Sequence, residues 1–293
     1  MAQFRAEKSR GCLLKIRGSF DSLKTAERRI AQYICEHPSE VVGLTINELV
    51  DRSKASYTSV SRFCKKMGYV GFKELKADLA NDIIYESQDI SSIPDVICTT
   101  GMSAEDILQH VYASSIQVLE DCMTITDLEM IDTVVNKMLS AHSIHFIGTG
   151  FSGLSAQYAC TKFFRIGLPC IFEPDTTIRR MRISLTQKDD LVFAISSSGR
   201  SKEIVECARI AKKCGASVVS LSDFTFSALS KVSDWNLYTT PRNMNIFMNI
   251  DMPLTIGQLM VLDTIYVFCC RKLEKRATER YHLTQIATDE EKL

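Results

Sequence analysis

The chain has 293 residues, more than one ordinary domain needs and enough for two. A hydrophobic content of 45% and a charged content of 24% are typical of a soluble globular protein and exclude a largely disordered one. The net charge is zero, but residues 1–85 carry 15 Lys and Arg against 10 Asp and Glu, and the remainder carries 20 against 25. This asymmetry predicts that only the N-terminal part meets a polyanion.

Residues 1–85 place apolar side chains at helical spacing and contain no β-rich run, which predicts an all-α domain. Within it, Thr25 is the expected cap of a helix that ends at His37-Pro38, because a residue before proline avoids helical geometry. Residues 86–102 lose this periodicity and gather Ser, Thr, Pro and Gly, so we interpret them as a linker. Residues 103–293 then form a second domain, which opens with helices between 103 and 139.

The 45–67 segment has the length of a helix-turn-helix, with helices at 45–52 and 56–67 and a turn at 53–55. Apolar residues line one face of its second helix, so the polar ones point outward. A recognition helix contacts base edges with its first turns and phosphates with its cations, although an ordinary helical bundle is the alternative. The predicted DNA-binding residues are Ser56 at the helix start, Tyr57, Thr58 and Ser61 for base edges, and Lys54, Arg62, Lys65 and Lys66 for phosphates.

From residue 143 onward, short apolar or β-favouring runs alternate with helical stretches, which predicts an α/β doubly wound parallel five-stranded sheet. In the strand order 2-1-3-4-5, the first and third strands are neighbours and the loops that follow them converge. The expected strands are 144–147, 169–172, 191–196, 218–221 and 235–238, and the helices between them are 152–166, 177–186, 201–214 and 227–232.

Two loops of this domain contain residue patterns that are typical of ligand-binding sites. The first, Gly148-Thr-Gly150-Phe-Ser152-Gly153, matches the dinucleotide pattern GxGxxG, and Glu173 lies 20 residues beyond it, so NAD binding is one interpretation. The second, Ser196 to Ser201, places three hydroxyls, a glycine and a further serine before a helix, where backbone N–H groups and the helix dipole favour an anion. Because a dinucleotide needs no second hydroxyl-rich loop, we favour a compact phosphorylated ligand.

Both halves resemble one family. The segment LTINELVDRSKASYTSVSRFCKKMGYVGFKELK closely resembles the helix-turn-helix of the RpiR family of transcription regulators, and IHFIGTGFSGLSAQYACTKFFRIG with DDLVFAISSSGRSKEIVECARIAKKCGASVVSLSD looks like the sugar isomerase (SIS) domain. The resemblance implies that Ser152, Ser196, Ser198 and Ser201 hold the phosphate of a sugar effector and that Ser197 adds its backbone. Gly150, Glu173 and Gly199 are further candidates for the effector pocket. Thr177, where many relatives have His, leaves the sugar unidentified.

The resemblance further implies an operator-binding regulator of carbohydrate or amino-sugar metabolism that acts as a homodimer or homotetramer. We expect no enzyme activity, because Glu173, Glu203 and Glu206 lack an evident acid–base partner, although an NAD(H)-sensing redox regulator and a sugar-phosphate isomerase stay open as alternatives.

The composition bears on partners and location as well. Eleven scattered cysteines without CxxC spacing, and no secretory signal, indicate reduced thiols in a cytoplasmic protein. Histidines without paired-ligand spacing predict no metal, and we expect no cofactor. The apolar 253–270 run carries Asp263 at its middle, which costs roughly 2.5–3.5 kcal/mol in a bilayer, so we expect a buried helix and no membrane.

Overall fold

The computed structural model describes residues 11–19, 23–88, 102–223, 227–240, 243–247, 250–253 and 255–289. These residues fall into two compact units. The first contains the described residues up to Ile125 and those between Thr240 and Leu254, and the second contains the rest. The 89–101 part of the expected linker lies outside the described residues.

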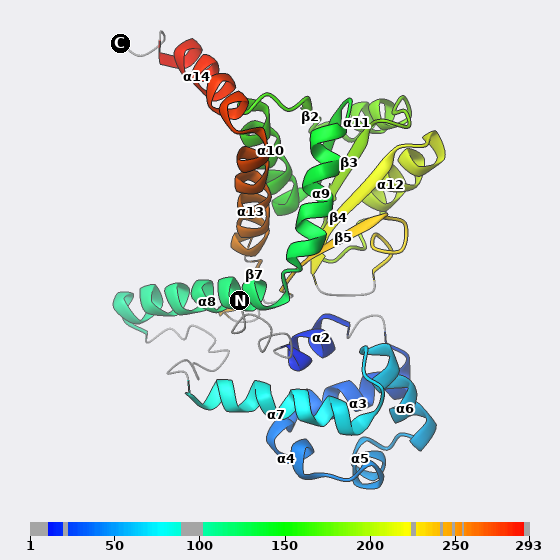
Figure 1. The fold of residues 1–293 in the computed structure, drawn as a ribbon. Helices are drawn as coiled ribbons and strands as arrows, with labels where there is room; N and C mark the ends of the chain where they lie inside the picture. Colours follow the sequence, from blue (N-terminus) through cyan, green and yellow to red (C-terminus); the bar gives the residue numbers. More distant parts are fainter. Residues whose placement is uncertain are drawn as a thin grey trace. The chain divides into compact units, whose positions relative to one another are not determined.

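The described residues of 1–88 are mainly helical (Figure 1), as the all-α prediction requires. Their helices are α2 (Cys12–Ser19), α3 (Thr25–Glu36), α4 (Pro38–Gly43), α5 (Ile46–Ser53), α6 (Tyr57–Lys66) and α7 (Phe72–Gln88). They enclose one apolar core whose fully buried members include Ile30, Ile34, Leu49, Val60, Phe63 and Leu75. The first unit also contains α8 (Ala104–Ile125), a segment expected to be helical as part of the second domain. It further contains an antiparallel hairpin of β6 (Asn243–Phe247) and β7 (Ile250–Pro253), which the sequence interpretation lacked.

The start of α3 corrects one prediction. Thr25 is the first helical residue, and the capping position belongs to Lys24. The Lys24 N–H donates to the Glu27 carboxylate over 3.1 Å, so the acidic side chain in the first turn satisfies the backbone donor of the N-cap residue.

The second unit contains a five-stranded parallel sheet in the order β2-β1-β3-β4-β5, which confirms the predicted doubly wound order. Its elements in chain order are α9 (Leu128–Ser140), β1 (Ile144–Ile147), α10 (Gly150–Arg165), β2 (Cys170–Phe172), α11 (Thr176–Ile183), β3 (Leu191–Ile195), α12 (Lys202–Cys214), β4 (Ser217–Asp223), β5 (Trp235–Thr239), α13 (Ile256–Leu273) and α14 (Lys275–Asp289).

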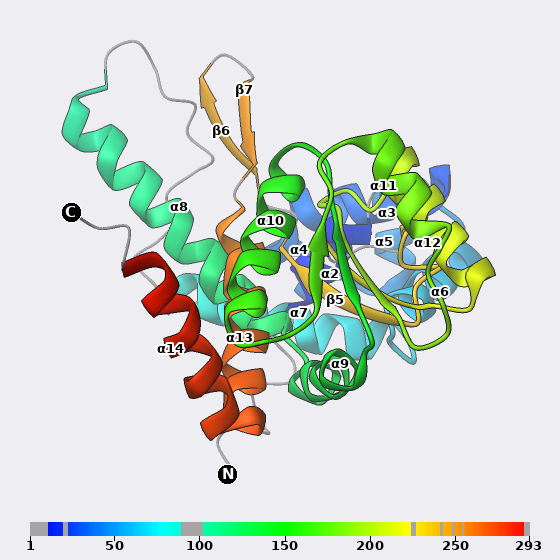
Figure 2. The same ribbon diagram turned by 90° about the horizontal axis from the view of Figure 1, so that it is seen from above.

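Helices cover both faces of this sheet (Figure 2). On one face, α9, α10 and α13 pack on strand residues such as Phe146 and Phe193. On the other, α11 and α12 pack on Ile147, Val192 and Ala194. Successive strand residues therefore enter opposite cores, which explains why the strands read as uninterrupted apolar runs.

The 227–232 stretch, expected to be helical, forms turns instead. Ser227 and Ser230 each accept the backbone N–H of the other at their side-chain oxygens, which closes a tight turn. The Leu229 N–H donates to the Gly199 carbonyl over 2.9 Å. This backbone amide is therefore bonded to the loop after β3 and is not available for a hydrogen bond within a helix.

The apolar run near the C-terminus becomes α13, with Val261, Leu262, Ile265 and Cys269 in the core, as expected for a buried helix. In the part of the chain that the structure describes, no helix combines the length and the apolar character that a membrane crossing demands.

Candidate functional sites

The turn between α5 and α6 has the geometry of a helix-turn-helix. At the start of α5, the Thr45 hydroxyl accepts the Glu48 N–H and the Glu48 carboxylate accepts the Thr45 N–H. Lys54 follows α5 with φ +50°, a left-handed conformation that reverses the chain within three residues. The Ser56 hydroxyl then accepts the Ser59 N–H over 3.2 Å and caps α6.

Helix α6 separates an apolar face from a polar one. Val60, Phe63 and Cys64 are buried in the core. Tyr57, at 58% exposure, lies on the opposite side. The end of the helix is set by Gly68, with φ +88°, and by the Tyr69 N–H, which donates to the Cys64 carbonyl. The remaining predicted contacts that point to solvent are Lys54, Thr58, Arg62 and Lys65, and Ser61 is half-buried.

Lys66 differs from the other cations of α6. It is half-buried, and its Nζ lies 3.3 Å from the Glu27 carboxylate of α3. Although burial alone would raise the pKa of the Glu27 carboxyl, the Lys24 N–H and the Lys66 ammonium hold it below its usual value. Lys66 therefore links two helices of the unit, a role that its place in the sequence did not reveal.

In the second unit, the glycines of the first loop have packing roles. A Cβ on Gly148 would lie 2.4 Å from the Ser152 carbonyl oxygen, and one on Gly153 would lie 3.2 Å from the Gly148 oxygen. Gly150, with φ +56°, begins α10. The GxGxxG pattern is thus accounted for by the close approach of a helix to a strand end, with no dinucleotide required.

The loops after β1 and β3 meet, as the strand order predicts. The Ser197 N–H donates to the Ser152 hydroxyl over 3.3 Å, and the two side-chain oxygens lie 3.4 Å apart. Close by, the Thr149 and Ser201 hydroxyl oxygens are also 3.4 Å apart. The structure thus brings hydroxyls from the starts of α10 and α12 together, where backbone N–H groups and helix dipoles favour negative charge.

The loop after β3 is a tight turn. Its Gly199 has φ +60° and donates its N–H to the Ser196 carbonyl over 2.9 Å. A Cβ at this position would lie 2.2 Å from the Ser227 hydroxyl oxygen, so only glycine fits. Ser196 is buried, whereas Ser198 is exposed and accepts the Arg200 N–H at its hydroxyl. The turn therefore presents one buried and one open hydroxyl beside the amides.

Gln258 of α13 completes this cluster. Its side-chain amide donates to the Ser197 hydroxyl over 2.9 Å and to the Ser152 hydroxyl over 3.3 Å, and the residue is 2% exposed. Sequence reasoning assigned the surrounding apolar run to a buried helix and gave this glutamine no role. The sequence contained one signal for such a role, a polar residue inside an otherwise apolar helix. A polar side chain that is buried there needs a hydrogen-bond partner.

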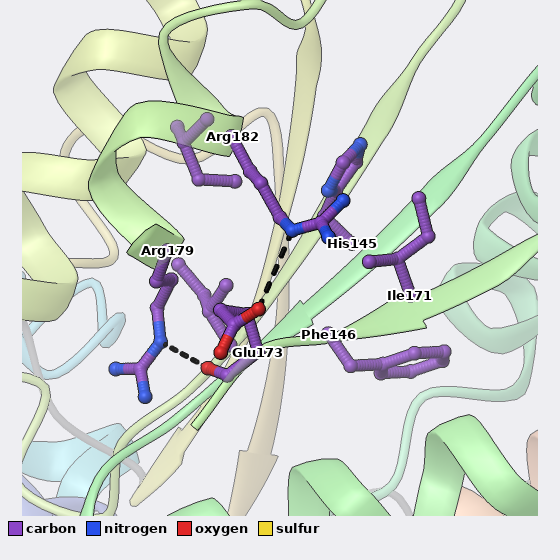
Figure 3. A pocket seen from close by; sticks show the side chains of 8 residues that line it. His145, Phe146, Ile171, Glu173, Arg179 and Arg182 are labelled. Atoms are coloured by element: carbon purple, nitrogen blue, oxygen red, sulfur yellow. Dashed lines mark hydrogen bonds and ion pairs between the residues drawn. The ribbon is translucent and has the colours of Figure 1, made fainter. Parts of the chain in front are cut away.

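Glu173 lines a small pocket at the end of β2 (Figure 3). Its carboxylate lies 3.4 Å from the Arg182 Nε and accepts the Asp175 N–H. Arg179 is buried there, donating to the Glu173 and Pro174 carbonyls and, over 2.7 Å, to the Glu203 carboxylate. The pocket is lined by His145, Phe146, Ile147, Ile171, Glu173, Arg179, Arg182 and Ile183, none of them from the serine loops.

Among the described residues, His, Cys, Asp and Glu side chains do not gather in threes as metal ligands would. The side chains of the serine cluster are neutral hydroxyl and amide groups. Such donors bind an anion without supplying an acid or a base.

Comparison with known families identifies both units. Residues 10–86 match the helix-turn-helix domain of the rpiR family, and residues 137–267 match the SIS domain. The fold and the two sites thus define a helix-turn-helix transcription regulator with a SIS domain. The chain belongs to the RpiR family.

Individual relatives cover nearly the whole chain. The uncharacterised regulator YbbH of Bacillus subtilis is 31% identical over 88% of this chain and 89% of its own length. The regulator HexR of Pseudomonas aeruginosa is 31% identical over 86% of this chain and 87% of its own. The structure of Vibrio vulnificus NanR complexed with ManNAc-6P is similar with a TM-score of 0.58 and 26% identity, covering 96% of this chain and 99% of that one.

Proposed function

We propose that this regulator binds a phosphorylated sugar in its SIS domain, that it is not an enzyme, and that the bound sugar changes its affinity for operator DNA. One observation carries the proposal: the Ser152 and Ser197 hydroxyls meet within 3.4 Å, close to the Thr149 and Ser201 hydroxyls that mark the starts of α10 and α12. Two helix N-termini and neutral hydroxyls favour a compact anion such as a phosphoryl group. Ser196, Ser198 and Ser201 belong to the same loop and complete the proposed phosphate set.

The relatives support a sugar as the rest of the effector. NanR was solved complexed with ManNAc-6P, a phosphorylated sugar, and it is similar over both units of this chain. We infer that the effector here is of the same chemical class and that the regulated genes serve carbohydrate or amino-sugar metabolism.

The proposed DNA contact is α6 in the major groove. Tyr57, Thr58 and Ser61 would face base edges, and Lys54, Arg62 and Lys65 would reach phosphates. A homodimer or homotetramer would place two such helices on a palindromic operator. The 69% and 68% exposure of Leu108 and Tyr112 on α8 supports association of this kind, because apolar side chains gathered on one helix favour a partner surface.

The two alternatives gain no support from the geometry. NAD(H) sensing relied on the GxGxxG loop and Glu173, yet the glycines have packing roles and the carboxylate pairs with Arg182. An isomerase needs a general base, commonly a carboxylate or His, at the sugar carbons, but Glu203, a candidate for that role, pairs with the buried Arg179.

Binding measurements on the intact protein test the proposal. Calorimetry against hexose 6-phosphates, amino-sugar 6-phosphates and NAD(H) identifies the ligand, and fluorescence anisotropy on a selected operator measures its effect on DNA binding. The Ser196→Ala/Ser198→Ala variant is expected to lose phosphosugar binding and the DNA response together, whereas Ser140→Ala at the end of α9 leaves both intact. The assignment is wrong if the double variant keeps its ligand affinity and its DNA response, and turnover of a bound phosphosugar would indicate the isomerase.

A further inference from the structure

The buried amide of Gln258 is the least explained part of the serine cluster. It comes from α13, far along the chain from both loops, yet it contacts the Ser152 and Ser197 hydroxyls at once. Burial of an amide costs free energy unless its donors and acceptor are paired. The hydrogen bonds that Gln258 makes, and the one that it lacks, therefore indicate which donors and acceptors a bound ligand would supply.

The hydrogen bonds that the Ser152 hydroxyl accepts leave it able to act only as a donor. The oxygen accepts two N–H groups, one from the Ser197 backbone and one from the Gln258 side chain, each over 3.3 Å. A hydroxyl oxygen has two lone pairs, so both are occupied and only the O–H remains. The Ser197 hydroxyl likewise accepts from Gln258 over 2.9 Å. The two hydroxyl oxygens lie 3.4 Å apart, so without a ligand the Ser152 O–H can donate to the Ser197 oxygen. The O–H groups are therefore the donors that this cluster can turn toward an acceptor such as a phosphoryl oxygen.

The other end of the same amide is unpaired. The Gln258 Oε1 is buried and has no hydrogen-bond partner in the part of the chain that the structure describes. A buried carbonyl left in this state is unfavourable, and a donor on a bound ligand would relieve it. A ligand that offers acceptors to the serine hydroxyls and one hydrogen to Gln258 would satisfy both ends of the amide.

We propose that Gln258 is a ligand-contacting residue that determines specificity: its NH₂ group sets the serine hydroxyls as donors to an anion, and its oxygen accepts a hydrogen from a hydroxyl of the same ligand. This deepens the proposed function and rests on it. The hydroxyl is that of a protonated phosphoryl group or of the adjoining sugar, and the choice of probe distinguishes them. A simple anion without any hydroxyl fits the site less well.

Two variants separate the two halves of this role. Gln258→Met keeps the size and burial of the side chain but removes its donors and its acceptor. Gln258→Glu keeps an acceptor but replaces the NH₂ group by a second oxygen, so the serine hydroxyls would donate to the carboxylate instead of the ligand, and its charge would repel an anion.

The probes are inorganic phosphate, which carries a hydroxyl near neutral pH, sulfate, which carries none, and the hexose 6-phosphates. Calorimetry on the full-length chain is expected to show wild type binding phosphate, or a hexose 6-phosphate, about 10-fold more tightly than sulfate. If inorganic phosphate already binds more tightly than sulfate, the hydroxyl that donates to Gln258 belongs to the phosphoryl group. If only the hexose 6-phosphates bind more tightly than sulfate, that hydroxyl belongs to the sugar. Gln258→Met should abolish the preference, and Gln258→Glu should weaken all three probes by about 100-fold or more.

Thermal unfolding without ligand is the control for folding. Gln258→Met should not lower the unfolding temperature, because it removes an unpaired buried carbonyl together with the two donors. A Gln258→Met protein that keeps the wild-type preference overturns the role of Gln258, even if the phosphosugar still binds. A wild-type protein that binds none of the three probes overturns the proposed function and this inference with it.

Discussion

The two units of this regulator place their functional residues in opposite ways. In the helical unit, the predicted DNA contacts lie on one continuous segment, Lys54 to Lys66, and most of them point to solvent. In the sheet unit, the serine cluster combines residues 152, 197 and 258 from three separate elements, and two of the three are buried. A DNA-binding surface must be exposed to reach the duplex, whereas a site for a small anion is a concave pocket that largely excludes water.

Each function is therefore sensitive to a different kind of substitution. Changing one outward side chain of α6 removes a contact and leaves the core intact. The proposed anion site depends on strand order and on glycines that permit close approach of a helix, and Arg179 holds the first turn of α12 through Glu203, so its function and its stability are expected to be coupled. The following four experiments test that distinction.

The largest effect is expected in the sheet unit, at Arg179. Replacing this buried arginine by Met leaves Glu203 and two backbone carbonyls without their donor, so the free energy of unfolding should fall by about 3 kcal/mol. Urea denaturation measures the loss. The matched control is Arg182→Met, because Arg182 is half exposed and its pair with Glu173 should contribute less than about 1 kcal/mol. Equal losses for both variants would mean that burial of Arg179 does not matter.

In the helical unit, we expect a substitution to weaken DNA binding without lowering the free energy of unfolding. Arg62→Gln/Lys65→Gln is expected to weaken operator binding by about 10- to 100-fold and to reduce the slope of log affinity against log salt by about 2. The unfolding free energy should stay near wild type, since both side chains are exposed. Lys66→Gln is the comparison, because Lys66 is paired with Glu27 and should change the salt slope least. An unchanged slope in the double variant would contradict the proposed role of α6.

A pH dependence is expected at Asp223, at the end of β4. Burial raises the pKa of its carboxyl to about 8, although the hydrogen bond from Thr239 opposes this. The unfolded carboxyl ionises near pH 4, so the native state loses stability as pH rises from about 4 to about 8. Asp223→Asn should therefore raise the unfolding free energy at pH 8 and change it little at pH 4. Thermal unfolding at the two pH values tests this, and an equal effect at both would rule out ionisation as the cause.

The smallest effect is expected at Ser56. Its hydroxyl caps α6, so Ser56→Ala should cost about 1 kcal/mol of stability. If capping is its whole role, the ratio of operator to non-specific DNA affinity will not change. Ser61→Ala should show the reverse, with altered discrimination and little loss of stability. A Ser56→Ala protein with normal stability and relaxed specificity would move this residue into the DNA contact set.

Much of the fold could be predicted because the signals are local. The apolar spacing of Val60, Phe63 and Cys64 indicates the buried face of α6, and five short apolar runs indicate the sheet. The prediction failed at 227–232, where reciprocal serine hydrogen bonds and the Gly199 carbonyl close turns. It also lacked the hairpin of β6 and β7. These features depend on partners that sequence spacing does not name.

For the sites, residue types by themselves indicated the chemistry: hydroxyls and glycines before helices favour an anion, and cations on an amphipathic helix favour DNA. Tertiary structure decided which side chains meet. It paired Lys66 with Glu27, separated Glu173 from the serines and brought Gln258 to Ser152. The physical reason is that periodicity reports which face of an element is buried, whereas contact between distant segments is set by how the elements pack around one core.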